Sequence, residues 1–159
     1  MVEPMKIDIG LPDKNRKAVS EALSAVLADT YTLYLKTHNF HWNVTGPNFY
    51  PLHKQFEELY SELALAVDEI AERIRALGHV APGSYAAFAK LTQIKESVGA
   101  PASRDMIRQL TADNETLVRV ARATKDLAEN LGDVETGDMM IERMQVHAKA
   151  AWMLRAQLK

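Results

Sequence analysis

Residues 48–78 read NFYPLHKQFEELYSELALAVDEIAERIRALG, and this stretch decides the fold. Asn48 is a suitable N-cap, and Gly78 is a suitable residue just beyond the last helical turn. At about 1.5 Å per residue the helix would be about 40 Å long, longer than most helices of globular proteins. Its apolar residues recur every three or four positions, as on one helix face: Phe49, Leu52, Phe56, Leu59, Leu63, Val67, Ile70, Ile74 and Leu77.

Three more long segments repeat apolar residues at helical spacing. The first has Asp13 as its expected N-cap and stops before Gly46-Pro47; the third is expected to be capped by Ser103 and to end at Gly132; the fourth is expected to start at Thr136. A short helix over 85–91 would interrupt the connection between the second and third. Four long helices with a long crossover in the middle predict an all-α, ferritin-like four-helix bundle.

Composition narrows the class of protein. The chain has 159 residues, enough for one domain, and we expect a short tail over 1–12 and a single bundle domain over 13–159. The absence of cysteine excludes disulfides and thiolate metal sites. The first ten residues lack the apolar run of a signal peptide or membrane anchor, so we expect a cytoplasmic or nucleoid protein without a membrane partner. A net charge of -2 gives no global attraction to nucleic acid.

Two pairs of metal-ligand residue types lie on the second helix. His53 and Glu57 are four residues apart and share a face, and Asp68 and Glu72 repeat that spacing. All four come one position after the apolar stripe, so they border the surface that faces the core. Imidazole and carboxylate groups without thiolates suit divalent iron, manganese or zinc.

The two pairs cannot meet within one helix, because Glu57 and Asp68 lie about 16 Å apart along its axis. An antiparallel second copy of the helix would bring them together. His53 and Glu72 are equally far in sequence from a point between residues 62 and 63, and so are Glu57 and Asp68. A two-fold axis at that point would build two equivalent sites, each with residues from both copies.

The same residues have simpler explanations. A His or Asp four residues before a Glu is common on helix surfaces, and Glu72 can form a local ion pair with Arg73 or Arg75. His41 lies on the inward stripe of the first helix and would add a ligand, but it and His38 are also compatible with hydrogen-bonded core histidines. The spacing alone therefore leaves a metal site and a plain helix surface both open.

The motif KTHNFHWNVTGPNF at 36–49, followed by Leu52-His53, Phe56, Tyr60 and Asp68-Glu69-Ile70-Ala71-Glu72-Arg73, resembles the Dps family. These are the DNA-binding proteins from starved cells, or mini-ferritins, and the resemblance extends to a last helix that carries Trp152. It implies a ferroxidase centre with ligands from two subunits. One chain would supply His41, His53 and Glu57, where some members have Asp in place of this Glu, and its neighbour would supply Asp68 and Glu72.

The resemblance also implies a function. Family members form a hollow homododecamer, oxidise Fe²⁺ with hydrogen peroxide or oxygen, and store ferric mineral, which protects DNA from oxidative damage under stress. Trp42 would lie near the iron, either supplying an electron or simply packing. Glu135 and Asp138 would line the pores through which iron enters, although acidic residues here also compensate a helix dipole.

DNA binding is expected to be weak. Some family members bind DNA through a long lysine-rich N-terminal tail, but this chain has few cations there and mixes them with acidic residues. The alternative function is a structural, DNA-compacting nucleoid protein with little ferroxidase activity. Its candidate phosphate contacts are Lys6, Lys14, Arg16, Lys17, Arg155 and Lys159.

Overall fold

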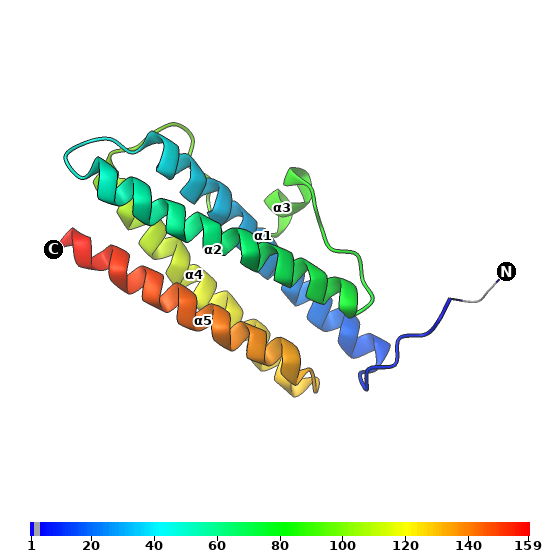
Figure 1. Cartoon of the computed structure of the whole chain (residues 1–159). Coiled ribbons are helices and arrows are strands. Elements are labelled where there is room, and N and C mark those ends of the chain that lie inside the picture. The colour runs from blue at the N-terminus through cyan, green and yellow to red at the C-terminus, as the bar shows by residue number, and fades with distance from the viewer. Residues whose placement is uncertain (2–3) are drawn as a thin grey trace.

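Four long helices lie side by side and form the body of the molecule (Figure 1). The structure is a computed structural model that describes residues 1 and 4–159. Among these residues there are helices and no strands, and none of the helices is long and apolar enough to cross a membrane. The elements are α1 (Asp13–Asn43), α2 (Phe49–Ala76), α3 (Tyr85–Leu91), α4 (Ser103–Asn130), α5 (Val134–Arg155) and the 3₁₀ turn η1 (Ala156–Leu158).

The connectivity is that of a ferritin-like bundle. α1 packs against α2, and α4 packs against α5. The crossover between α2 and α4 runs back along α1, so that α2 and α4 point in the same direction (Figure 1). Hydrogen bonds from α1 side chains to crossover carbonyls fix this path: Asn39 Nδ2 lies 3.2 Å from the Ser97 oxygen, and Lys36 Nζ lies 2.9 Å from the Lys95 oxygen. The predicted fold class and the short helix over 85–91 are confirmed.

The core lies where the apolar stripes of the long helices meet. The stripe on α2 is buried at most of its predicted positions, although Phe49 at its start is exposed. Burial of these side chains supplies most of the favourable free energy of folding. The largest fully buried side chains come from α1, α2, α4 and the residues just after α2: Leu23, Leu27, Leu33, Phe40, Leu52, Phe56, Ile70, Ile74, Leu77, Met106, Leu110 and Leu117.

Gly78 ends α2 as predicted. Its φ of +94° is a left-handed conformation that side chains with a Cβ rarely adopt. The space around it is also filled, because a Cβ there would clash with Ile7 Cδ1 and lie 2.8 Å from Arg16 Nη1. Arg16 Nη1 donates to the Leu77 carbonyl at 2.8 Å, which ties the start of α1 to the end of α2.

Three predicted helix starts are wrong by one or two residues. Pro12 and Ala102 hold the N-cap positions of α1 and α4, so Asp13 and Ser103 are the first helical residues rather than caps. α5 begins at Val134, two residues before Thr136, because the buried Asp133 caps it. At α1 and α4 no side chain caps the first turn, so a polar residue does not mark the exact start, whereas at α5 the capping Asp133 is held in place by Arg73 of α2.

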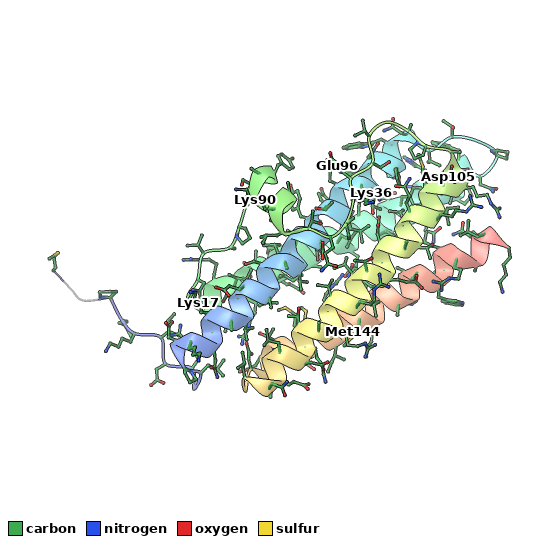
Figure 2. The ribbon with its side chains drawn as sticks, turned by 180° about the vertical axis from the view of Figure 1, so that it is seen from behind. Lys17, Lys36, Lys90, Glu96, Asp105 and Met144 are labelled. Carbon is green, nitrogen blue, oxygen red and sulfur yellow. The ribbon has the colours of Figure 1, made fainter. Side chains whose placement is uncertain are left out.

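Buried charges hold the crossover against the bundle. Asp29 Oδ1 accepts hydrogen bonds from Thr92 Oγ1 and from the Gln93 backbone N–H, both at 2.7 Å. Lys36 Nζ lies 2.7 Å from Asp113 Oδ2, and Figure 2 shows Lys36 where α1, α4 and the crossover come together. Burial raises the pKa of Asp29 and of Asp113 above the ordinary range.

Candidate metal centre

His41 and His53 form a stacked pair at the end of the bundle where α1 leads into α2. Their ring centroids are 3.9 Å apart and the ring planes differ by 16°. The hydrogen bonds are reciprocal: His41 Nδ1 lies 2.8 Å from the backbone oxygen of His53, and His53 Nδ1 lies 2.8 Å from the backbone oxygen of His41. The turn between the two helices therefore brings the two predicted histidine ligands together and fixes both rings.

These hydrogen bonds determine the tautomer of each ring. A backbone carbonyl only accepts hydrogen bonds, so each Nδ1 must carry its proton and donate it. In a neutral ring the lone pair then lies on Nε2, which is the atom available to a metal. Metal-binding histidines commonly donate their other ring N–H to a backbone carbonyl or a carboxylate, which orients the ring and makes it a better ligand.

Glu57 lies one turn after His53 on α2. Its Oε2 is 2.8 Å from Lys54 Nζ. The hydrogen bond from Lys54, and then the charge of Lys54, lower the pKa of Glu57, with smaller contributions from His41 and His53. The carboxylate is thus kept charged beside the histidine pair, and its exposed ion pair with Lys54 is weak enough to open for a metal ion.

Asp68 and Glu72 are exposed, further along α2, and they do not join the histidines of the same chain. Across residues 1 and 4–159, no three His, Asp or Glu side chains are grouped so that they could hold a metal ion. One chain therefore presents two separate parts of a ligand set: two imidazoles with one carboxylate, and a pair of carboxylates.

The α2 surface between the two parts is partly apolar. Leu65 is 70% exposed, Ala64 beside it is exposed, and Tyr60 is half-buried. A small residue such as Ala64 permits close approach of another helix. This face is compatible with the antiparallel contact predicted from the sequence.

Neither arginine near Glu72 pairs with it in the structure. Arg73 Nη2 lies 2.6 Å from Asp133 Oδ1, and Arg73 Nε lies 3.0 Å from Thr136 Oγ1. Arg75 Nη1 donates to the His79 carbonyl at 2.9 Å. The simple explanation of Glu72 as part of a local ion pair with Arg73 or Arg75 is therefore wrong, because both guanidinium groups are used elsewhere.

Trp42 does not lie against His41. It is 58% exposed, and its ring centroid is 3.8 Å from that of His38. His38 in turn stacks on Tyr60 at 4.2 Å, and Tyr60 meets His41 edge-on at 5.0 Å. Burial, and then the charge of His41, lower the pKa of His38. Tyr60 was visible in the sequence only as a position on the α2 face between the two ligand pairs.

The predicted pore residues lie near the start of α5, Glu135 in its first turn and Asp138 just after it. Glu135 is exposed and lies 3.9 Å from Arg73 Nη2, whereas Asp138 is exposed nearer to the second turn. The neighbouring Asp133 is buried and accepts hydrogen bonds from the Thr136 N–H and from Arg73. Asp133 is thus a structural cap, and Glu135 and Asp138 remain the carboxylates that face outward here.

His147 belongs to a different network, which sequence reasoning did not find. Its Nδ1 lies 2.8 Å from Asn114 Oδ1 and its Nε2 lies 3.0 Å from Arg143 Nη2. Arg143 also forms a two-pronged ion pair with Glu62. Burial, and then the charge of Arg143, lower the pKa of His147 to about 3. Because both ring nitrogens are used, His147 is a packed core histidine and no metal ligand.

Several of the cations considered for DNA binding are occupied. Arg16 is buried and donates to backbone carbonyls, so it is not available to phosphate. Lys17 lies 3.8 Å from Glu21, and Arg155 pairs with Glu115. Arg16 is thus excluded as a phosphate contact, whereas Lys14 is exposed and the ion pairs of Lys17 and Arg155 are exposed and weak.

Comparison with known proteins agrees with this architecture. A family profile described as the Ferritin-like domain matches residues 20–159. A low temperature-induced protein of Nostoc sp. (strain PCC 7120) is 40% identical over 153 residues, which cover 95% of this chain and 86% of that protein. DNA protection during starvation protein 2 of Bacillus anthracis is 37% identical over 142 residues, covering 89% and 97%.

A solved protein structure is also similar to this chain. The Dps protein of Vibrio cholerae O1, described as a member of a broad superfamily of ferritin-like diiron-carboxylate proteins, superposes with a TM-score of 0.93. The two sequences are 33% identical, and the match covers 99% of this chain and 100% of the other. The chain therefore belongs to the Dps family of ferritin-like proteins.

Proposed function

We propose that this protein is a ferroxidase and iron-storage mini-ferritin whose catalytic site forms between two copies of the chain. The observation that carries the proposal is the reciprocal hydrogen bonding of His41 and His53. It leaves the Nε2 lone pair of each ring free for a metal ion, and a charged Glu57 follows on the next turn. Carboxylates from a second copy would complete a ligand set of imidazole and carboxylate groups, which suits iron.

The partner would contribute the exposed pair on its own α2. An antiparallel contact about a point between Glu62 and Leu63 would place Glu72 of the partner subunit beside His53 and Asp68 of the partner subunit beside Glu57. The exposed Ala64 and Leu65 would be covered in the same contact. Each pair of chains would then hold two equivalent sites.

Iron is the substrate of this reaction. Two Fe²⁺ ions supply two electrons to one hydrogen peroxide, which takes up two protons and yields two water molecules, so no hydroxyl radical is released. The few, partly exposed ligands favour turnover over permanent retention of the product. Molecular oxygen would be the slower alternative oxidant.

The product would be stored in a cage. We propose a homododecamer in the bacterial cytoplasm or nucleoid, with Fe²⁺ entering beside Glu135 and Asp138 and ferric mineral accumulating inside. Removal of Fe²⁺ and peroxide together protects DNA from radical damage. That outcome agrees with the name of the Bacillus anthracis relative, a DNA protection protein.

DNA compaction is the second candidate function, since the DNA protection for which several relatives are named could also act through direct contact with DNA. The free cations of this chain would contact DNA weakly and repeatedly over the cage, so binding would depend on avidity and fall steeply with salt. The burial of Arg16 favours the ferroxidase over this alternative.

One substitution pair tests the proposal. Asp68→Ala removes a carboxylate that lies outside the histidine cluster of its own chain, and Glu69→Ala removes an exposed carboxylate from the next position of the same helix. After anaerobic loading with Fe²⁺ and addition of peroxide, we expect Asp68→Ala to lose fast ferric absorbance while Glu69→Ala behaves like the parent. Equal rates in all three proteins, each sized as an intact cage, would exclude Asp68 as a ligand.

A further inference from the structure

One carboxylate of the candidate metal centre is already paired with a cation of its own chain. Lys54 Nζ lies 2.8 Å from Glu57 Oε2, and the two side chains are 50% and 41% exposed. Both residues belong to α2, and the lysine comes three positions before the glutamate. Oppositely charged pairs stabilise an isolated helix better when the acidic residue comes first, so helix stability alone does not account for this pair.

The other cations of α2 are directed away from the predicted ligands. Arg73 pairs with Asp133, and Arg75 donates to the His79 carbonyl. Among the basic residues of α2, all of which the structure describes, only Lys54 is paired with a predicted metal ligand. The charge of the lysine therefore belongs to the site, whereas the charges of the two arginines serve the packing of the helix end.

The predicted two-fold contact gives that charge more to balance. It would bring Glu57 together with Asp68 and Glu72 of the partner subunit, which makes three carboxylates around the two imidazoles. Carboxylates that share a site repel one another unless a cation lies among them. In the same register Lys54 lies at the level of Ala71 of the partner subunit, because both are equally far in sequence from the point between residues 62 and 63. The lysine would thus stand between the carboxylates of its own chain and those of its neighbour.

We propose that Lys54 is a displaceable counter-cation, which neutralises the carboxylates of the empty site and leaves Glu57 when a divalent metal ion binds. This inference rests on the metal centre of the proposed function. It gives the lysine two effects of opposite sign. Lys54 stabilises the metal-free assembly, and it raises the Fe²⁺ concentration at which the site fills.

The chemistry of the lysine side chain suits such an exchange. The ammonium group is strongly hydrated and is carried on a flexible four-carbon stem, so it can move into solvent without any movement of α2. The carboxylates exchange one cation for another and are never left without a counter-charge. Because the pair with Glu57 is exposed, the competition lowers the affinity for a metal ion only modestly, by about threefold to fivefold.

The test is a titration of the assembled, metal-free protein with Co²⁺, whose visible absorption reports its coordination. Lys54→Met removes the charge and should bind Co²⁺ about threefold to fivefold more tightly than the parent. Lys54→Arg keeps the charge and should bind Co²⁺ no more tightly than the parent. Lys125→Met is the matched control, since Lys125 lies 2.7 Å from Glu129 in an ion pair on α4, and it should leave the affinity unchanged.

The stability of the cage gives a second, independent readout. Without metal, Lys54→Met should dissociate into smaller species at a lower urea concentration than the parent, measured by size-exclusion chromatography. Saturating Co²⁺ should abolish or reverse this difference, because the metal ion then replaces the lysine charge. A lysine with a merely structural role would weaken the cage with and without metal and would not weaken metal binding.

A further variant keeps the test decisive if Lys54→Met fails to assemble. Lys54→Gln also removes the charge but retains a polar side chain, and it should show the same two effects. Co²⁺ binding that is unchanged or weaker in the uncharged variant would overturn the proposal. A metal-free cage that is as resistant to urea as the parent would also overturn it.

The failure of this inference and that of the proposed function are distinguishable. Fast oxidation of Fe²⁺ by the parent, with equal Co²⁺ affinity in the parent and Lys54→Met, would overturn the role of Lys54 and leave the ferroxidase intact. Tighter Co²⁺ binding in Lys54→Met, with only slow oxidation of Fe²⁺ by the parent, would support the counter-cation and overturn the ferroxidase. A parent and a variant that both fail to bind Co²⁺ would overturn the metal centre and the role of Lys54 with it.

Discussion

At His41 and His53, the protein backbone decides which ring nitrogen can bind a metal. Each carbonyl takes the Nδ1 proton of the other residue's ring, so the two rings hold each other in one tautomer without help from another side chain. His147 shows the opposite arrangement, since Asn114 and Arg143 use both of its nitrogens. Residue type alone does not separate a ligand from a core histidine; the hydrogen-bond partners do.

His147 should make stability depend on pH. Its pKa is lowered from 6.5 to about 3 in the folded protein. Between these values the unfolded chain binds a proton that the folded chain does not, so the free energy of unfolding falls as the pH is lowered. Urea unfolding at fixed protein concentration should show a loss of about 2 kcal/mol from this residue between pH 7 and pH 5.

The comparison of variants isolates this effect. The Gln of His147→Gln cannot titrate, so this variant should lose the part of the decrease in the free energy of unfolding below pH 7 that His147 causes. His79→Gln, at the end of α2, should retain that decrease. Asp29 and Asp113, whose pKa values are raised by burial, contribute equally in both variants. The same decrease in both variants would show that His147 is not the responsible group.

At the scale of the elements, the helix ends depend on contacts between distant parts of the chain. Asp133 caps α5 through the Thr136 N–H and also accepts from Arg73 of α2, so one buried carboxylate joins two helices. Asp133→Ala removes the cap and leaves the mostly buried Arg73 without its partner. We expect a loss of about 3 kcal/mol in the free energy of unfolding, measured by urea denaturation.

Glu135→Ala is the control for that prediction. Glu135 lies two residues further along and close to the same arginine, but it is exposed, so its removal should change stability by less than about 0.5 kcal/mol. If both variants lose the same amount, the stabilising contribution does not come from the buried carboxylate.

The sequence predicts the elements better than their ends. Periodic apolar residues locate all four long helices, and the residues 85–91 become α3 as expected. Asp13 and Ser103 are misplaced as caps because α1 and α4 begin without a side-chain cap, and Thr136 is misplaced because Asp133, held by Arg73 of α2, caps α5. No local pattern contains that information.

The same limit applies to the candidate site. Spacing on one helix reveals His53 with Glu57 and Asp68 with Glu72, because helical geometry is local. The contact of His41 with His53 depends on the turn between α1 and α2. It becomes visible only when the chain is folded.

At the scale of the whole molecule, one chain carries the predicted metal ligands in two separate parts, one where His41 of α1 meets His53 and Glu57 of α2, and one further along α2. The described residues of a single copy do not bring the histidine pair and the Asp68–Glu72 pair together. In the proposed two-fold arrangement each part would complete the other, so catalysis would require assembly. Two different inactive chains should therefore restore activity to each other.

A hybrid of His53→Ala and Asp68→Ala tests that claim most directly. In a mixed pair one site carries both substitutions and the other carries neither, so co-assembled cages should regain Fe²⁺ oxidation at about one quarter of all sites if the chains mix at random. A cage built from either variant alone should be inactive, with unchanged helical content. Verified hybrid cages that oxidise Fe²⁺ no faster than the cages of either single variant would contradict a site shared between two chains.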